Sequence, residues 1–184
     1  MKRLANYGCA NDPIYEEGVD WYNFDKEFKS FMIGDDNAQS WDLTVSPDLI
    51  STRHGTQGYY VEFFDGGVIN HVLCTMPDYQ AHKVLTNIHR SLKPGAELIV
   101  IDMDLLKVFK SYQEGREADI PIEEGDIDDK LCFAISGYGT RDSLYTPARM
   151  KKVLVEAGFR IVAEISESEY DTRPKESLCF KAIK

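Results

Sequence analysis

Near its start the chain reads Arg3-Leu-Ala-Asn-Tyr-Gly-Cys-Ala-Asn-Asp-Pro13, a short apolar run followed by small, turn-forming residues. The run Leu4 to Tyr7 has the character of a strand, and it stops at Gly8. A strand that ends in such a turn allows a ligand to lie against bare backbone amides. A second strand-like run, Val19 to Phe24, ends at Asp25. Strand, glycine turn, strand and acid is the order in which a Rossmann-like sheet binds a nucleoside, with the acid bonding the ribose hydroxyls.

Length and composition favour a single soluble domain. The 184 residues suffice for one core, and 43% apolar with 28% charged residues is typical of a globular protein. No apolar run approaches the roughly 20 residues of a membrane helix, and the N-terminus lacks the apolar segment of a signal peptide. We therefore expect a cytoplasmic protein. The net charge of −10 disfavours nucleic acid as a partner and favours a small or neutral substrate.

The cysteines and histidines predict no metal centre. The four cysteines lie far apart without a Cys-x-x-Cys or Cys/His spacing, which disfavours both a zinc site and a disulfide framework. Free cysteines in apolar runs indicate a reducing compartment. His82 and His89 lie seven residues apart on an expected helix, where we expect both to be solvated. The cysteines are Cys9, Cys74, Cys132 and Cys179.

The clearest pattern is a strand, a helix and a second strand in close order. Val68 to Cys74 is a nearly continuous apolar run, as in a buried central strand. Asp78 is a candidate cap for a helix over 79–92, whose apolar residues recur at three- and four-residue steps. Pro94-Gly95 ends that helix, and Glu97 to Ile101 is a second buried strand. This order predicts a right-handed parallel crossover.

The segment before this crossover is less regular. For residues 26–33 the sequence is compatible with a short helix or with an irregular connection. Trp41 to Val45 is expected as a strand closed by Pro47, and 46–58 as a loop. Tyr59 to Phe64 is aromatic and β-branched, so we expect a strand, followed by a turn at Asp65-Gly66-Gly67.

The last third of the chain contains two more helices and a strand pair. Residues 105–113 are expected to be helical, and 115–130 form an acidic, turn-rich loop or flap. Thr146 and Pro147 open a helix that Gly158 ends. Two alternating runs, Arg160 to Glu164 and Leu178 to Ile183, predict an antiparallel pair at the sheet edge. We therefore expect one domain over 1–184 with an acidic flap or insert at about 106–140.

Four stretches in this order resemble a small class I S-adenosylmethionine-dependent methyltransferase, most closely the short bacterial and phage type. Leu4 to Pro13 resembles the cofactor turn, and Val19 to Asp25 the second strand with its ribose acid. Val68 to Gly95 resembles the fourth strand, its helix and the Leu-Lys-Pro-Gly entry to the fifth strand. Leu144 to Phe159 resembles the last helix with its Ala-Gly-Phe exit. The resemblance implies a Rossmann-like, mostly parallel sheet with helices on both faces, an antiparallel C-terminal strand pair and a reduced first helix.

The resemblance also implies S-adenosylmethionine as cofactor. Ala10 stands where the family has a second glycine, and Asn11 to Gly18 is too short for more than one helical turn. Asp42 is the first choice for the acid near the adenine, and Asp65 the alternative. Two roles remain possible for His71: it contacts the acceptor or acts as a base, or it is a buried, hydrogen-bonded residue of the strand. The implied cofactor contacts are Tyr7, Gly8, Cys9, Ala10, Asp25, Asp42, Leu43, Asn70 and His71.

For the acceptor, Tyr138, Arg141 and Tyr145 follow the acidic flap and are expected to close over it. Methyl transfer to a small-molecule or glycan-type acceptor is the leading interpretation. The alternative is a methyltransferase-like fold that binds a nucleoside or protein partner without catalysis. A nicotinamide-dependent oxidoreductase is disfavoured, because the chain lacks a GxGxxG motif and contains the Leu92-Lys-Pro-Gly95 stretch.

Overall fold

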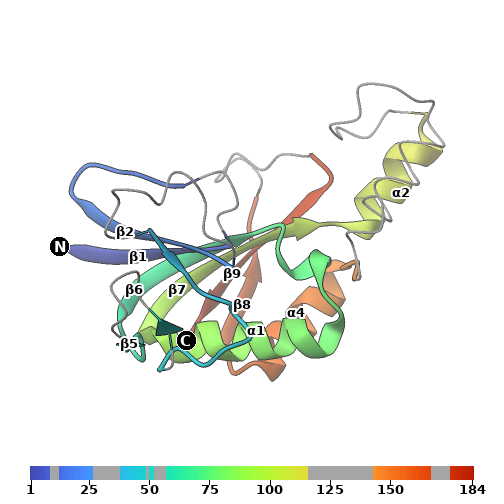
Figure 1. The fold of residues 1–184 in the computed structure, drawn as a ribbon. Coiled ribbons are helices and arrows are strands. Elements are labelled where there is room, and N and C mark those ends of the chain that lie inside the picture. The colour runs from blue at the N-terminus through green and yellow to red at the C-terminus, as the bar shows by residue number, and fades with distance from the viewer. Residues whose placement is uncertain (9–12, 27–37, 49, 52–56, 116–142, 167–174) are drawn as a thin grey trace.

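A sheet of seven strands runs through the structure, a computed structural model that describes residues 1–8, 13–26, 38–48, 50–51, 57–115, 143–166 and 175–184 (Figure 1). The strands of this sheet are β1 (Lys2–Tyr7), β2 (Val19–Asp25), β3 (Ala38–Ser40), β6 (Phe64–Asn70), β7 (Leu92–Met103), β8 (Ile161–Glu164) and β9 (Ser177–Ile183).

The strand order is β3-β2-β1-β6-β7-β9-β8. The first five strands of this order pair in parallel, whereas β9 pairs antiparallel with both β7 and β8. This confirms the α/β class and the mostly parallel sheet with an antiparallel C-terminal pair. In chain order β9 follows β8, yet it lies inside the sheet and leaves β8 at the edge. Residues 13–18 contain no helix, in agreement with the reduced first helix.

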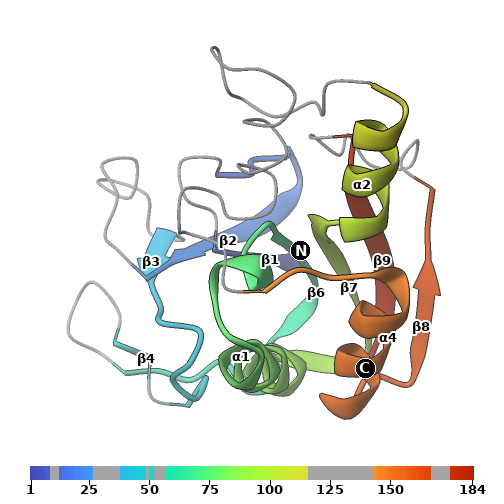
Figure 2. The ribbon, with the colours of Figure 1, turned by 90° about the vertical axis from the view of Figure 1, so that its right-hand side faces the viewer.

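Two of the described helices, α1 (Asp78–Ser91) and α4 (Pro147–Glu156), cover the same face of the sheet (Figures 1 and 2). Their apolar residues enter the main core, since helical three- and four-residue spacing places them on one side. The third, α2 (Leu105–Gln113), reaches beyond the end of β7 (Figure 1). It is tied to the start of β9 by a 2.9 Å hydrogen bond from Ser111 Oγ to Glu176 Oε1.

The ends of α4 agree with the sequence prediction. The Thr146 side chain accepts a hydrogen bond from the Arg149 backbone N–H, and Pro147 occupies the first turn. Gly158 follows the helix with φ +106°, a conformation that side chains other than glycine rarely adopt. The helix therefore begins and ends where the local chemistry requires.

The expected strand at Tyr59 to Phe64 and the turn at Asp65-Gly66-Gly67 are both wrong. β6 begins at Phe64 and runs through the two glycines. A Cβ on Gly67 would lie 2.8 Å from the Ala5 carbonyl oxygen and 2.7 Å from Tyr7 Cε2. The glycine is therefore required by the close approach of the Tyr7 ring to β6, and it forms no turn.

The expected strand at Trp41 to Val45 is also wrong, because this segment forms turns directly after β3. The Trp41 ring is buried, and its Nε1 donates to the Val45 carbonyl at 3.0 Å. The expected loop over 46–58 contains a small antiparallel hairpin of β4 (Ile50–Ser51) and β5 (Gln57–Gly58). Of the segment 26–33, for which a short helix and an irregular connection were both possible, residues 27–33 lie outside the described residues.

The central strand is shorter than expected, and Asp78 does not cap α1. β6 ends at Asn70, because His71 takes the left-handed φ of +52° and a 3-10 turn, η2 (Leu73–Thr75), follows. Pro77 is the N-cap residue of α1. The Asp78 carboxylate pairs instead with Arg149 at the start of α4. This contact joins the two helices.

The main core between the sheet and the helices contains a group of mutually packed aromatic rings. A smaller apolar cluster lies on the opposite face, where alternate residues of the same strands point. The described residues include no helix long and apolar enough to span a membrane. Of the expected flap at 106–140, residues 116–140 lie outside the described part of the chain. The aromatic group is Tyr7, Tyr22, Phe24, Trp41, Tyr60, Phe63 and Phe64.

Candidate functional site

A cavity of about 600 Å³ opens at the carboxyl ends of β1, β2 and β6. Open α/β sheets bind ligands at this edge, and the volume falls within the usual range for small-molecule sites. Trp41, Asn6 and Ile14 are among the residues that line it. Six of the predicted cofactor contacts line the cavity, namely Gly8, Asp25, Asp42, Leu43, Asn70 and His71.

Gly8 closes β1 in a conformation that leaves no room for a side chain. Its φ is +73°, and its N–H donates to the Phe24 carbonyl at 2.8 Å. A Cβ at this position would lie 2.4 Å from Cγ2 of Val72, in the segment that follows β6. The glycine therefore allows the turn after β1 to approach the end of the neighbouring strand.

Asp25 is the last residue of β2 and lies at the cavity beside the turn after β1. Its carbonyl accepts a 2.8 Å hydrogen bond from the backbone N–H of Trp41, which joins the end of β2 to the following turn. The side chain is partly buried. The backbone at this predicted ribose acid is thus fixed at the edge of the cavity.

The carboxylate of Asp42 is already hydrogen-bonded. Its Oδ1 accepts from the Thr44 N–H at 3.0 Å and from Thr44 Oγ1 at 2.7 Å. Burial acts to raise the pKa of Asp42, but the hydrogen bonds from Thr44 and the charge of Lys26 outweigh it and lower that pKa. The alternative acid, Asp65, does not line this cavity; it accepts from the Arg3 N–H and from Lys93 Nζ. Of the two candidate acids, Asp42 is thus the one that lines the cavity.

The sequence prediction missed two buried asparagines beside the cavity. Asn6 Nδ2 donates to Asn23 Oδ1 at 3.1 Å, and the Asn23 amide also bonds both backbone groups of Ile14. These bonds fix the chain that leads from the turn after β1 into β2. An asparagine inside a strand-like run was the available signal, since a buried polar side chain requires partners.

Several residues predicted to contact the cofactor or the acceptor are buried away from the cavity, and others lie outside the described residues. The Tyr7 side chain is fully buried in the core, where its hydroxyl hydrogen-bonds Ser91 Oγ at 2.8 Å, and burial raises its pKa. The Tyr145 side chain is also fully buried and does not line the cavity. His89, expected to be solvated, packs edge-on against the Phe159 ring at 5.1 Å. Outside the described residues lie Cys9, Ala10, Tyr138 and Arg141.

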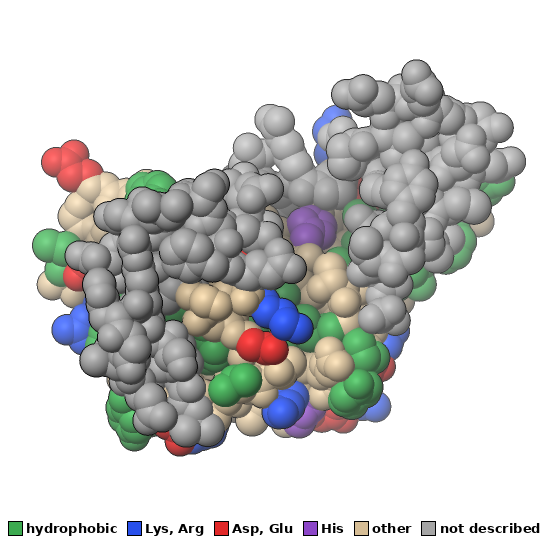
Figure 3. Space-filling view, in the orientation of Figure 1, with side chains coloured by type: hydrophobic (Ala, Val, Ile, Leu, Met, Phe, Trp, Pro, Cys, Tyr) green, Lys and Arg blue, Asp and Glu red, His purple; other side chains and the backbone are tan. Residues whose placement is uncertain are grey.

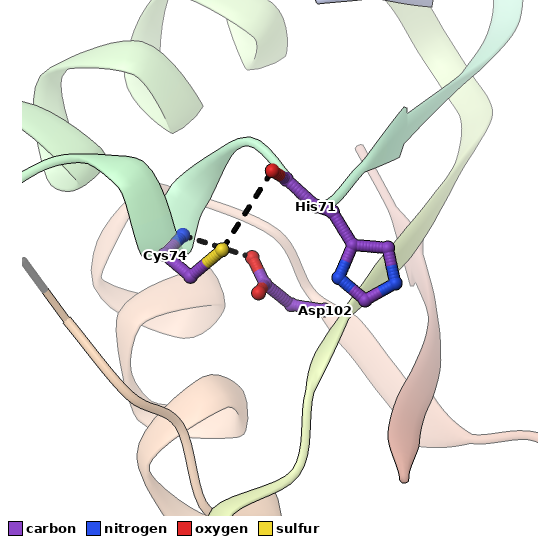
Figure 4. A group of neighbouring side chains, drawn as sticks. All are labelled: His71, Cys74 and Asp102. Atoms are coloured by element: carbon purple, nitrogen blue, oxygen red, sulfur yellow. Dashed lines mark hydrogen bonds between the residues drawn. The ribbon is translucent and has the colours of Figure 1, made fainter. Parts of the chain in front are cut away.

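A second group of titratable side chains, one of which lines the cavity, lies at the ends of β6 and β7 (Figure 4). His71, Cys74 and Asp102 bring one nitrogen, one sulfur and one carboxylate oxygen within 4.8 Å of one another. Asp102 is fully buried, and this burial raises its pKa although the nearby His71 opposes the shift. Spacing along the chain, which predicted no metal centre, does not reveal this group, because the topology brings its members together.

Charged side chains of both signs lie on the face drawn in Figure 3. Among the described residues of that face, acidic and basic side chains are interspersed with hydrophobic and polar ones. The absence of a nucleic-acid partner, inferred from the net charge of −10, stays a prediction.

No protein-family model and no curated protein sequence matches this chain. Solved structures do match. An S-adenosylmethionine-dependent methyltransferase from Mesorhizobium loti is 14% identical with a TM-score of 0.59, covering 99% of this chain and 90% of its own. Human N-acetylserotonin methyltransferase, solved in complex with S-adenosylmethionine, is 16% identical with a TM-score of 0.54. The DszA carbon methyltransferase is 16% identical with a TM-score of 0.61.

At this level of identity the likeness concerns the fold. The chain has the fold of class I S-adenosylmethionine-dependent methyltransferases, as its sequence motifs indicated. It spans about half the length of several of these proteins, since it covers 47% of the human enzyme and 47% of DszA.

Proposed function

We propose that this chain binds S-adenosylmethionine in the cavity at the ends of β1, β2 and β6 and transfers its methyl group to a small-molecule or glycan-type acceptor. The observation that carries the proposal is the convergence on one cavity of six residues chosen from sequence motifs alone. A methyltransferase fold adds to this support. We further propose a cytoplasmic enzyme of the short bacterial and phage type.

The cavity residues suit the three parts of the cofactor. The Asp25 carboxylate, at the end of β2, would accept hydrogen bonds from the ribose hydroxyls. Asp42 and Leu43 would lie beside the adenine, where the Trp41 ring offers an apolar wall. The turn at Gly8 would take the methionine portion against its backbone, and Asn70 and His71 would contact the cofactor from β6.

The chemistry requires little of the protein beyond placement. When bound, the cofactor supplies a methyl group activated by a sulfonium. The residues of the cavity would hold the acceptor in line with that group and exclude water, and such orientation lowers the barrier by several kcal/mol, up to about 7–11. A general base is required only for acceptors that must lose a proton.

A second function is a methyltransferase-like protein that binds a nucleoside or protein partner without catalysis. Ala10, in place of a glycine, favours it. The lack of a helix over 13–18 also favours it, because a helix N-terminus facing the ligand would assist binding.

Calorimetric titration with S-adenosylhomocysteine tests the binding. We expect the wild type to bind and Asp25→Ala to bind at least about tenfold more weakly, which corresponds to about 1.4 kcal/mol. Asp65→Ala is the matched control, since this acid of the same sheet does not line the cavity. No binding by the wild type, or equal binding by Asp25→Ala, would contradict the proposal. A screen of acceptors with labelled cofactor then separates an enzyme from a binding protein.

A further inference from the structure

We propose that His71, Cys74 and Asp102 form a binding site for a zinc-class divalent cation. The three residues come from the end of β6, the turn η2 and the end of β7 (Figure 4). β6 and β7 are parallel neighbours, so their carboxyl ends meet at one edge of the sheet. The site is therefore a product of the fold and lies beside the cavity.

The donor set selects the kind of cation. An imidazole, a thiolate and a carboxylate are the ligands of zinc and related transition metals, whereas magnesium and calcium prefer oxygen ligands alone. Zinc bonds of about 2.0–2.3 Å at tetrahedral angles place ligand atoms about 3.3–3.6 Å apart. The three donor atoms already lie within 4.8 Å of one another, so rotamer adjustments of about 1 Å complete the geometry.

The surroundings orient two of the three ligands. Asp102 accepts hydrogen bonds from the Cys74 N–H at 3.1 Å and the Met103 N–H at 2.8 Å, which fix its carboxylate. His71 Nε2 is hydrogen-bonded to Ser177 Oγ at 3.2 Å, and Figure 4 shows the other ring nitrogen directed toward Cys74 and Asp102. A metal-binding histidine commonly holds its second nitrogen in such a hydrogen bond.

The burial of two of the three ligands favours the binding of a cation. Asp102 is fully buried and Cys74 is 2% exposed, and an ionised carboxylate or thiolate in such surroundings requires a compensating charge. The described residues offer no hydrogen-bond partner to the hydroxyl of Tyr145, which is also fully buried. The segment that carries Tyr145 meets the site, since the Ser143 N–H donates to the Cys74 carbonyl at 3.1 Å and Tyr145 pairs with Asp104 in a β-bridge. An orphaned buried hydroxyl in this segment is an independent sign of an additional group.

The position of the site also indicates a use. His71 lines the cavity, and the donor atoms of Cys74 and Asp102, which do not line it, lie within 4.8 Å of the His71 donor. Three protein ligands leave one position of a tetrahedral cation open, as in catalytic zinc sites, for a hydroxyl or thiol of an acceptor. This use rests on the proposed methyl transfer, whereas cation binding itself does not.

The test is a titration of chelator-treated, metal-free protein with Zn²⁺, followed by calorimetry, and with Mg²⁺ for comparison. We expect one equivalent of Zn²⁺ to bind and Mg²⁺ not to compete. Titration with Co²⁺ should produce a sulfur-to-cobalt charge-transfer band, because Cys74 supplies a thiolate. Cys74→Ala and Asp102→Asn should weaken Zn²⁺ binding at least about tenfold, and Cys74→Ser should remove the cobalt band.

Cys179→Ala is the matched control, since Cys179 is an equally buried cysteine in the cluster on the opposite face of the sheet. It should bind Zn²⁺ as the wild type does. Circular dichroism establishes that each variant is folded. Failure of the wild type to bind one equivalent, or unchanged binding by a folded Cys74→Ala or Cys74→Ser variant, would overturn the site. If the wild type binds Zn²⁺ but does not bind S-adenosylhomocysteine, only the proposed methyl transfer is rejected.

Discussion

The side-chain amide of Asn23 holds both backbone groups of Ile14: its Oδ1 accepts from the Ile14 N–H at 2.9 Å, and its Nδ2 donates to the Ile14 carbonyl at 3.2 Å. Asn23 is fully buried in β2, and Ile14 lines the cavity. One side chain thus provides the backbone partners that a helix after β1 would otherwise supply.

Replacement of Asn23 by alanine should therefore destabilise the fold. The Ile14 N–H and carbonyl and the Asn6 amide would each lose a partner, and an unsatisfied buried group costs about 1–3 kcal/mol. Urea unfolding measures the change. Gln113→Ala, at an exposed position of α2, is the control and should change stability by less than about 0.5 kcal/mol. Equal stabilities of the two variants would show that the Asn23 bonds are not needed.

The second prediction concerns the contact between Gly8 and Val72. Gly8→Ala should lower the free energy of unfolding by about 1–3 kcal/mol, since alanine is strained at φ +73° and its Cβ would clash with Val72. Val72→Ala removes the clashing methyl groups but leaves the backbone strain. A double-mutant cycle by urea unfolding should give a coupling of about 0.5 kcal/mol or more. Simple additivity would mean that the backbone conformation alone demands glycine.

The third prediction is a pH dependence that arises from His89. Burial, with the charges of Lys184 and Arg160, lowers the pKa of His89 below its ordinary value of 6.5, while a hydrogen bond with Gly158 opposes the shift. Below pH 6.5 the unfolded chain therefore binds the proton more readily than the folded one, and stability falls as the pH drops.

Urea unfolding at about pH 7.5 and about pH 5.5 measures this effect. His89→Gln should lose less stability between the two values than the wild type does. His82→Gln, at an exposed position of the same helix, should follow the wild type. If all three proteins lost the same stability, the dependence would have to come from other groups.

The fourth prediction concerns the pair that joins α1 and α4. The hydrogen bond from Arg149 lowers the pKa of Asp78, so any stabilisation is present above the unfolded value of about 3.9 and is lost in acid. Both side chains are substantially exposed, at 40% and 54%. Arg149→Met should therefore cost no more than about 1 kcal/mol, and salt near 1 M should reduce the difference from the wild type. A loss above about 2 kcal/mol would contradict this prediction, and its insensitivity to salt would assign it to the hydrogen bond from Arg149 to the Leu144 carbonyl rather than to the ion pair.

The sequence predicted most reliably those parts whose pattern reflects a single local rule. α1 and α4 followed from apolar spacing, and Thr146, Pro147 and Gly158 from end chemistry. The strand ends at Gly8 and Asp25 were also predicted, since β1 ends at Tyr7, directly before Gly8, and β2 ends at Asp25.

Prediction was wrong where a distant contact determined the conformation. The paired glycines Gly66 and Gly67 resemble a turn, but both lie inside β6, where a Cβ on Gly67 would lie 2.7 Å from the Tyr7 ring and one on Gly66 would lie 3.0 Å from the Glu97 carbonyl oxygen. The aromatic run before them resembles a strand, but Glu62 takes a left-handed φ of +51°. The His71, Cys74 and Asp102 group has no signature in the chain, because parallel pairing of β6 and β7 determines which residues meet.

The burial of Trp41 in the cavity wall has a spectroscopic consequence. The chain has two tryptophans, and Trp21 packs against the apolar cluster on the opposite face of the sheet. In a Trp21→Phe variant, the emission of Trp41 becomes an intrinsic reporter of the cavity. Its emission should change as a ligand alters the polarity of the cavity beside the buried indole, so occupancy can be followed in real time with an unlabelled protein.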